Sequence, residues 1–176
     1  MQKFMLLLAL FLLVAGVASA QDDAPKFQVF GGYSYIRATD QGNHINFNGG
    51  SVSASYNLRR YVDVVADFGL YHGGRTGVSG NLVTSMGGPK FAYRIGKFTP
   101  FAQALFGAGH ASIGASYSFR AENAFAAAIG AGVDAKVSPR ISVRLIQIEH
   151  LITKFDDGDN NQQSDTRVSA GFVYRF

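Results

Sequence analysis

The 176-residue chain contains no cysteine and no tryptophan, and only 16% of its residues are charged. Without cysteine, disulfides are excluded as a source of stability. The formal net charge of +4 is small and the basic residues are scattered, whereas a nucleic-acid surface needs a clustered patch, so no nucleic-acid partner is expected. Phosphate-loop spacing, Cys/His ligand clusters and nucleotide-binding fingerprints are also missing, and no cofactor or metal is expected. Glycine and aromatic residues are abundant, with 21 Gly, 15 Phe and 8 Tyr, and this composition favours strands and turns.

The first twenty residues, "MQKFMLLLALFLLVAGVASA", have the three parts of a secretory signal peptide. Lys3 supplies the positive region, an apolar stretch follows, and Ala18 and Ala20 form the small-residue cleavage site. The alternative, a permanent membrane helix, is disfavoured because the apolar stretch is short and acidic residues follow it. We therefore expect a cleaved signal peptide at 1–20 and one domain at 21–176.

After Ala20 no apolar run approaches the roughly 20 residues that a transmembrane helix needs. The pattern that remains has a period of two. Residues 125–136, 167–176 and 62–71 each alternate an apolar face with a small or charged face. In the first of these segments the apolar positions are Phe125, Ala127, Ile129, Ala131, Val133 and Ala135. Such alternation is long for a globular sheet and close to the roughly 9 to 11 residues of a tilted membrane-spanning strand.

Short turns alternate with longer polar or glycine-rich segments along the chain. Turn signals occur at 57–60, 95–100 and 137–140, and the longer segments, predicted to be loops, at 38–50, 72–81, 110–123 and 153–164. This gives four hairpins and eight strands, with short turns on one side and long loops on the other, as in outer-membrane barrels. The predicted strand cores are 27–37, 51–57, 61–71, 82–95, 101–109, 123–136, 141–151 and 165–176. The expected fold is all-β, an eight-stranded antiparallel up-and-down transmembrane β-barrel.

The small face of the strands carries charges of both signs, and its many Gly, Ala and Ser residues suit a narrow lumen. Asp63 and Asp67 are expected to pair with Lys90 and Arg94 on the following strand, because unpaired charges are costly in such an interior. A structural ion-pair core is one interpretation, and a gated ion or proton path through the same residues is the other. The charged residues expected in the lumen are Asp63, Asp67, Lys90, Arg94, Asp134, Lys136, Arg144, Arg167 and Arg175.

The chain ends on "SAGFVYRF". With Ser169, Gly171, Tyr174 and Phe176, this strand resembles the C-terminal signal that the barrel-assembly machinery reads in bacterial outer-membrane proteins. Three segments, "FQVFGGYSYI", "KFTPFAQALFGAG" and "ISVRLIQIEHLITKF", are similar to the first, fifth and seventh strands of the OmpA-like family of small outer-membrane barrels. The whole mature chain resembles that family in its barrel-only form, with no sequence left for a peptidoglycan-binding domain.

The resemblance implies a location in the bacterial outer membrane and a set of partners. These are the barrel-assembly machinery and periplasmic chaperones during biogenesis, then membrane lipid and lipopolysaccharide around a monomer. Eight strands enclose an interior that side chains just fill. The leading hypothesis is a non-enzymatic protein whose four surface loops contribute to envelope integrity or to surface interactions such as adhesion. The alternative is a narrow porin-like pore for small solutes.

A second alternative is an enzyme. His110 and Ser112 resemble the His-x-Ser pair of PagL-like lipid A deacylases, in which the histidine activates a serine nucleophile. Ile113 stands where that family has asparagine, and Glu122 is the only nearby acid to orient the base. The other interpretation of the pair is a chance occurrence in a Ser- and Gly-rich loop.

Two further loop features have weak functional alternatives. The stretch "DDGDN", from Asp156 to Asn160, clusters possible calcium ligands but lacks the spacing and closing Glu of an EF-hand, which favours a solvated acidic loop. His44 and His72 are expected in solvent at loop entrances. His150 is expected near the lipid headgroups.

Overall fold

Eight antiparallel strands close into a barrel in the computed structural model, which describes residues 25–40, 43–75, 78–115, 118–155 and 162–176. Each strand pairs with its neighbours in sequence, and β1 pairs with β8 from Gln28↔Arg175 to Arg37↔Thr166. The predicted fold class is thereby confirmed. No helix that could span a membrane occurs in the described part of the chain. The strands are β1 (Phe27–Asp40), β2 (Asn43–Arg59), β3 (Val62–Arg75), β4 (Val78–Ala92), β5 (Phe98–Ala115), β6 (Ser118–Lys136), β7 (Ile141–Phe155) and β8 (Gln162–Arg175).

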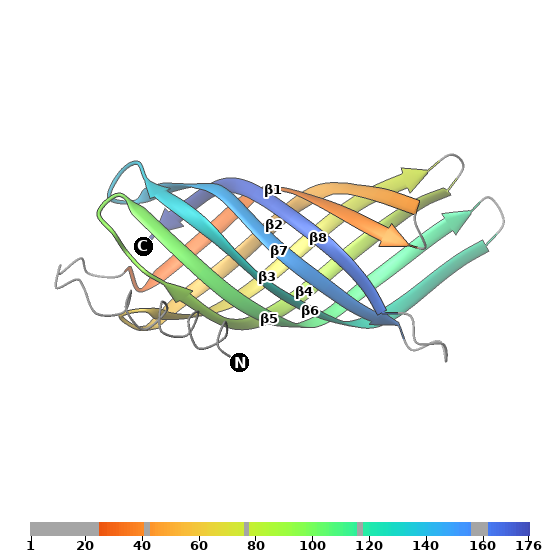
Figure 1. The fold of residues 1–176 in the computed structure, drawn as a ribbon, viewed down its shortest axis with the longest axis horizontal. Coiled ribbons are helices and arrows are strands. Elements are labelled where there is room, and N and C mark those ends of the chain that lie inside the picture. Colours follow the sequence, from red (N-terminus) through yellow and green to blue (C-terminus); the bar gives the residue numbers. More distant parts are fainter. Residues whose placement is uncertain (1–24, 41–42, 76–77, 116–117, 156–161) are drawn as a thin grey trace, which may run out of the picture.

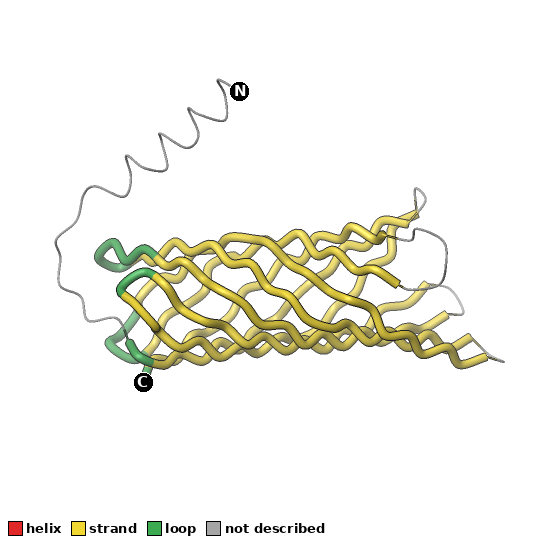
Figure 2. The backbone as a smooth tube through the Cα atoms, turned by 90° about the horizontal axis from the view of Figure 1, so that it is seen from below, coloured by secondary structure: helices red, strands yellow, loops and turns green. Residues whose placement is uncertain are grey.

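The two ends of the barrel differ, as Figures 1 and 2 show. Short turns link β2 to β3, β4 to β5 and β6 to β7 at the end where β1 begins and β8 finishes, which we call the turn end. Between β4 and β5, Ile95 and Phe98 exchange backbone hydrogen bonds of 2.7 and 2.9 Å across Gly96, whose φ of 55° favours glycine. The opposite end, where four hairpins close, is the tip end.

The prediction of long loops at the tip end is wrong for the first three hairpins. The β1–β2 ladder continues to Asp40↔Asn43, the β3–β4 ladder to Arg75↔Val78 and the β5–β6 ladder to Ala115↔Ser118. Ladder hydrogen bonds join backbone groups, so polar and glycine residues can continue a hairpin where it leaves the lipid. Because the polar and glycine residues there form no apolar face, the sequence loses its period-two pattern although the strand continues.

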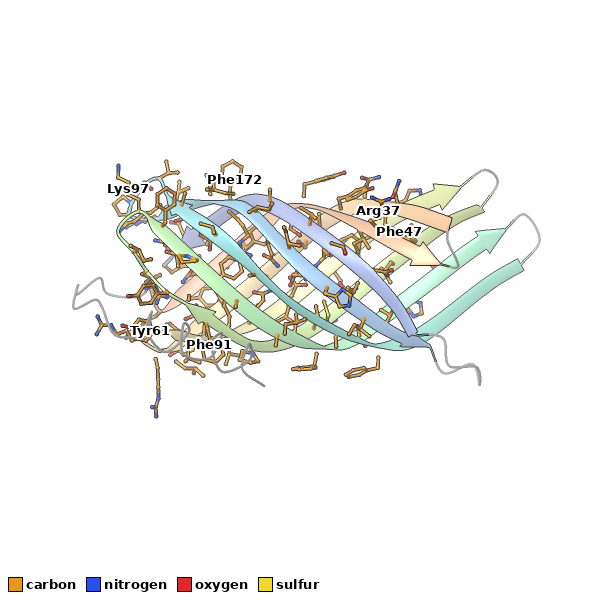
Figure 3. The ribbon with its side chains drawn as sticks, in the orientation of Figure 1. Arg37, Phe47, Tyr61, Phe91, Lys97 and Phe172 are labelled. Carbon is orange, nitrogen blue, oxygen red and sulfur yellow. The ribbon has the colours of Figure 1, made fainter. Side chains whose placement is uncertain are left out.

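The outward face of the barrel is apolar. Large exposed side chains stand on every strand, among them Phe68, Phe106, Ile129 and Phe172. Figure 3 shows Phe172 and Phe91 projecting away from the ribbon. The alternation within 62–71, 125–136 and 167–176 has the predicted sense, with the apolar face outside and the face that carries the small and charged residues inside, where Val65, Tyr71 and Val173 also lie. Exposure on this scale suits a protein whose surroundings are hydrocarbon rather than water.

Glycine permits the close approach of β1 and β8 where the barrel closes. Gly32 lies opposite Gly171 in the ladder. A Cβ atom on Gly171 would lie 2.4 Å from the carbonyl oxygen of Gly31, and one on Gly32 would lie 2.3 Å from the carbonyl oxygen of Ala170. Any larger residue would therefore push the two strands apart at this seam.

Candidate functional site in the barrel lumen

The predicted lumen residues lie on the inward face of the described strands and the turn that follows β4. Seven of them are buried, namely Asp63, Asp67, Lys90, Asp134, Arg144, Arg167 and Arg175. Lys136 is half-buried at the end of β6. Arg94 follows β4 instead of lying within it as predicted, and its side chain is 11% exposed. Their charged side chains make three separate sets of contacts along the lumen, each of which we call a group.

The central group is built around Arg167 on β8. Its Nε donates to Oε2 of Glu149 at 2.6 Å, and its Nη1 donates to Oδ1 of Asp67 at 2.9 Å. Nη1 also lies 2.9 Å from the hydroxyl of Tyr71, and Gln103 donates to the other Glu149 oxygen at 2.9 Å. These five side chains come from β3, β5, β7 and β8, so the network spans the lumen and ties distant strands together. These hydrogen bonds offset the cost of removing the charges from water, although Nη2 of Arg167 is buried without a hydrogen-bond partner among the described residues.

A second group lies nearer the turn end, around Arg144 on β7. Its Nε and Nη2 donate to the two carboxylate oxygens of Asp134 at 2.8 and 3.2 Å, a bidentate pair, and its Nη1 donates to Gln147. The guanidinium carbon lies 4.2 Å from the ring centroid of Phe30 and 4.5 Å from that of Phe101. The ammonium of Lys90 lies 4.5 Å from the same Phe101 ring. Cation–π contacts thus add to the ion pair in holding these buried cations.

The third group closes the lumen at the turn end. Asn57 donates to Oδ1 of Asp63 at 2.5 Å, and Nη2 of Arg94 lies 3.7 Å from the same oxygen. Nη1 of Arg94 donates to the backbone carbonyl of Arg60 at 2.7 Å. The ion pair here is longer and less buried than the three ion pairs of the other two groups, so it contributes the least to stability.

The pairing of Asp67 differs from the prediction. Asp67 accepts a hydrogen bond from Arg167 on β8, and not from Lys90 on β4 or Arg94 in the following turn. In the β3–β4 ladder Asp67 lies opposite Met86, whereas Lys90 lies opposite Asp63, nearer the turn end. Inward side chains of a narrow barrel meet across the lumen, so a partner can come from a strand that is not adjacent.

Glu149, the second acid bound by Arg167, is not among the residues predicted to line the lumen. Strict alternation from Arg144 places position 149 on the outward face. A bulge in β7 changes the phase, because Leu145 is an extra residue relative to both neighbouring strands. Leu145 and Ile146 are both exposed, and residues 147 and 149 therefore face the lumen together with 144. The sequence alone does not mark the bulge, because Leu151 and Ile152 also stand side by side in this strand without one.

An apolar layer lies in the lumen beside the Arg167 network and on its tip-end side. Its residues come from six strands, β1 and β3 to β7, and Phe47 on β2 packs against it. The layer consists of Ile36, Val65, Tyr71, Leu82, Met86, Leu105, Ala126, Ala128 and Leu151. A permeating ion would have to cross both this layer and the ion-pair groups, which together occupy the part of the lumen whose side chains the structure describes.

The C-terminal strand contributes to barrel closure at each predicted signal residue. The amide of Phe176 donates to the carbonyl of Phe27 at 2.9 Å, and the two rings lie 5.4 Å apart. Tyr174 packs edge-on against Phe176 at 4.8 Å. Ser169 points inward, where its hydroxyl shares a 2.7 Å hydrogen bond with Ser34. Gly171 lies at the seam described above.

The candidate catalytic pair lies on the tip-end half of β5. His110 is exposed and Ser112 half-buried, two positions apart on the same face. In the β5–β6 ladder Glu122 lies opposite Ala111, and neither His110 nor Ser112 is its partner. The ladder therefore does not align the acid with the pair, and the arrangement of a catalytic triad is not supported by the register.

The remaining predictions for individual residues have mixed outcomes. His72 is exposed on β3 and its Nδ1 lies 2.7 Å from Oδ1 of Asn81, and His150 is exposed on β7. His44 lies within β2. Ala18 and Ala20, as well as the acidic stretch 156–160, lie outside the described residues. Within the described residues, no cluster of three or more His, Asp or Glu side chains could hold a metal ion.

A closed antiparallel barrel with an apolar outer face and a lumen plugged by side chains defines a transmembrane β-barrel. The model of the outer membrane protein beta-barrel domain family matches residues 5–176, and the chain belongs to that family. The resemblance to OmpA-like eight-stranded barrels is thereby confirmed. A search of curated protein sequences finds no match.

Solved structures share the fold at low sequence identity. The Neisserial surface protein A is 15% identical, with a TM-score of 0.74 over 88% of this chain and 100% of its own. Ail of Yersinia pestis is 21% identical, with a TM-score of 0.61 over 86% of this chain and 99% of its own. The N-terminal barrel of Pseudomonas aeruginosa OprF is 17% identical, with a TM-score of 0.56 over 86% and 98%. At these identities the likeness shows a shared barrel fold.

Proposed function

We propose that this chain is a non-enzymatic protein of the bacterial outer membrane that presents its hairpin tips at the cell surface for adhesion. The observation that carries the proposal is the plugged lumen. The Arg167 network and the apolar layer next to it leave the interior occupied by side chains, so the tip end is the part of the molecule left to meet other molecules. Envelope integrity is the accompanying role, through the rigid barrel itself.

The relatives support a surface role by analogy. Ail is named the attachment invasion locus protein of Yersinia pestis, and it has also been solved in complex with the heparin analogue sucrose octasulfate. For this chain we propose export by a signal peptide cleaved after Ala20, folding with periplasmic chaperones and the barrel-assembly machinery, and a monomer surrounded by lipid and lipopolysaccharide. Fractionation should recover the mature protein in the outer membrane, with an N-terminus at Gln21.

The decisive experiment compares adhesion and conductance in one set of variants. Cells that lack the gene are complemented with the parent, or with a variant whose four hairpins are shortened, with residues 39–44, 74–79, 114–119 and 154–162 each replaced by a two-residue Asn-Gly turn. Both are scored for attachment to host cells and to immobilised sulfated polysaccharide. We expect the parent to restore attachment and the tip variant to reach the membrane without restoring it.

Purified parent protein should show no single-channel conductance in planar bilayers. Steady conductance would support the pore alternative and overturn the proposal. Lipid A mass spectrometry of the same strains, with Ser112→Ala beside the parent, tests the enzyme alternative. A mass change that depends on Ser112 would overturn the non-enzymatic assignment.

A further inference from the structure

Exposed basic side chains surround the turn end of the barrel. They come from the residue before β1, from the end of β2 and from all three described turns, so they are spread around the circumference. Figure 2 shows these turns together at one end, and Figure 3 labels Lys97 there. We call this set the basic rim. It consists of Lys26, Arg59, Arg60, Lys97 and Arg140.

Acidic side chains do not balance the rim. Asp63 and Asp134, the acids near this end, are buried and turned toward Arg94 and Arg144 in the lumen. Among the side chains that the structure describes at the turn end, no acidic one is exposed. The carboxyl group of Phe176 and residues 22–23, which are acidic and lie outside the described part, still leave the basic groups in excess.

The rim lies directly beside an aromatic belt. Tyr61 stacks on Tyr93 with ring centroids 5.7 Å apart, and the guanidinium of Arg60 lies 5.3 Å from the centroid of Tyr61. Phe91 and Phe98 are exposed on the neighbouring strands. Aromatic belts mark the level of the lipid headgroups, so the long Lys and Arg side chains just beyond them reach the phosphate level.

We propose that the basic rim binds the phosphate groups of anionic phospholipids in the leaflet that surrounds the turn end. A single polymer or protein partner would contact one sector of the barrel, whereas cations on every turn match a ligand that surrounds it. Each Lys or Arg held close to an anionic membrane surface strengthens binding by about fivefold. The inference rests on the proposed membrane placement, with the short turns facing the periplasm.

The test measures lipid selectivity of the full barrel in phosphatidylcholine vesicles. Spin-labelled phosphatidylglycerol and spin-labelled phosphatidylcholine compete for the barrel surface, and electron spin resonance gives their relative association constant. We expect selectivity for phosphatidylglycerol of about fivefold at low salt, falling toward one at ~1 M salt, where the Debye length is ~3 Å. The rim variant Lys26→Gln, Arg59→Gln, Lys97→Gln and Arg140→Gln should show a ratio near one at either salt concentration.

A matched variant removes four positive charges from the opposite end. Arg37→Gln, Arg75→Gln, Arg120→Gln and Lys154→Gln lie at the tip-end side of β1, β3, β6 and β7. This tip variant should keep the selectivity of the parent. If both variants lose it equally, overall charge and not the rim sets the preference, and the proposal is overturned.

Two further arms identify the ligand and guard against misfolding. Soluble glycerol phosphate at the same phosphate concentration should leave the lipid selectivity unchanged, whereas displacement by it would show a simple phosphate site. Co-sedimentation of the parent, but not of the rim variant, with purified peptidoglycan, together with a lipid association ratio near one, would assign the rim to the cell wall instead.

If the fourfold variant does not fold, the double variant Lys97→Gln and Arg140→Gln should still lower the ratio of phosphatidylglycerol to phosphatidylcholine association while keeping the β content of the parent. None of these outcomes depends on the tips, so the result is separate from the adhesion experiment.

Discussion

Replacing Arg167 with methionine should lower the free energy of unfolding by about 3–5 kcal/mol. The change keeps an unbranched side chain but removes the 2.6 Å bond to Glu149 and the 2.9 Å bond to Asp67. Each hydrogen bond to a charged group contributes about 1.5–3 kcal/mol, so the loss of two accounts for this range. The two carboxylates left behind are at most 4% exposed and have lost the cation that offset their burial.

Urea unfolding of the barrel in lipid vesicles measures this loss. Because the chain has no tryptophan, far-UV circular dichroism is the appropriate signal. The midpoint should fall while the slope stays constant, since the slope reports the surface exposed on unfolding. Arg37→Met, at an exposed arginine on β1, serves as the control and should change stability by less than about 0.5 kcal/mol.

A compensated variant separates charge burial from packing. Arg167→Met combined with Glu149→Gln and Asp67→Asn leaves no unpaired charge in the central group and should recover most of the lost stability. If the single variant costs less than about 1 kcal/mol, the network contributes no more than a surface ion pair. If the compensated variant is as unstable as the single one, the loss comes from packing and the electrostatic reasoning is refuted.

Three further predictions follow from the same geometry. Deleting Phe176 should lower the yield in the outer membrane while the purified protein still refolds in detergent micelles with near-parental β content, and equal membrane yields would reduce "SAGFVYRF" to an ordinary strand. Arg94→Ala should cost only about 1 kcal/mol or less in urea midpoint experiments, because its ion pair with Asp63 is 3.7 Å long and partly exposed, and a loss near that of Arg167→Met would contradict this ranking. Gly171→Ala should cost about 1–3 kcal/mol through its clash at the seam, whereas Gly31→Ala, with no atom within 4 Å of the new Cβ, should be close to neutral in the same assay; similar values for the two would argue against a tight seam.

Local chemistry in the sequence determined the class of fold. Alternation in 62–71, 125–136 and 167–176 needs no knowledge of other strands, because successive side chains of any strand point to opposite faces. Turn residues such as Gly96 act within a few positions, so strand number and order could also be predicted. The same alternation put Asp134, Arg144 and Arg167 on the small face, where the structure has them.

Only the tertiary structure decided which lumen residues meet and how far the strands run. The partner of Asp67 lies on β8, one hundred residues away in the chain, and depends on how the closed barrel sets the height of each strand against the others. Glu149 faces Arg167 because the bulge at Leu145 shifts the phase of β7, and a bulge is stabilised by its two neighbouring strands rather than by its own sequence. The hairpins continue past the apolar band for a related reason. Backbone hydrogen bonds to a partner strand extend the hairpins. A sequence shows only the pattern of side chains, and that pattern does not reveal where backbone hydrogen bonds form.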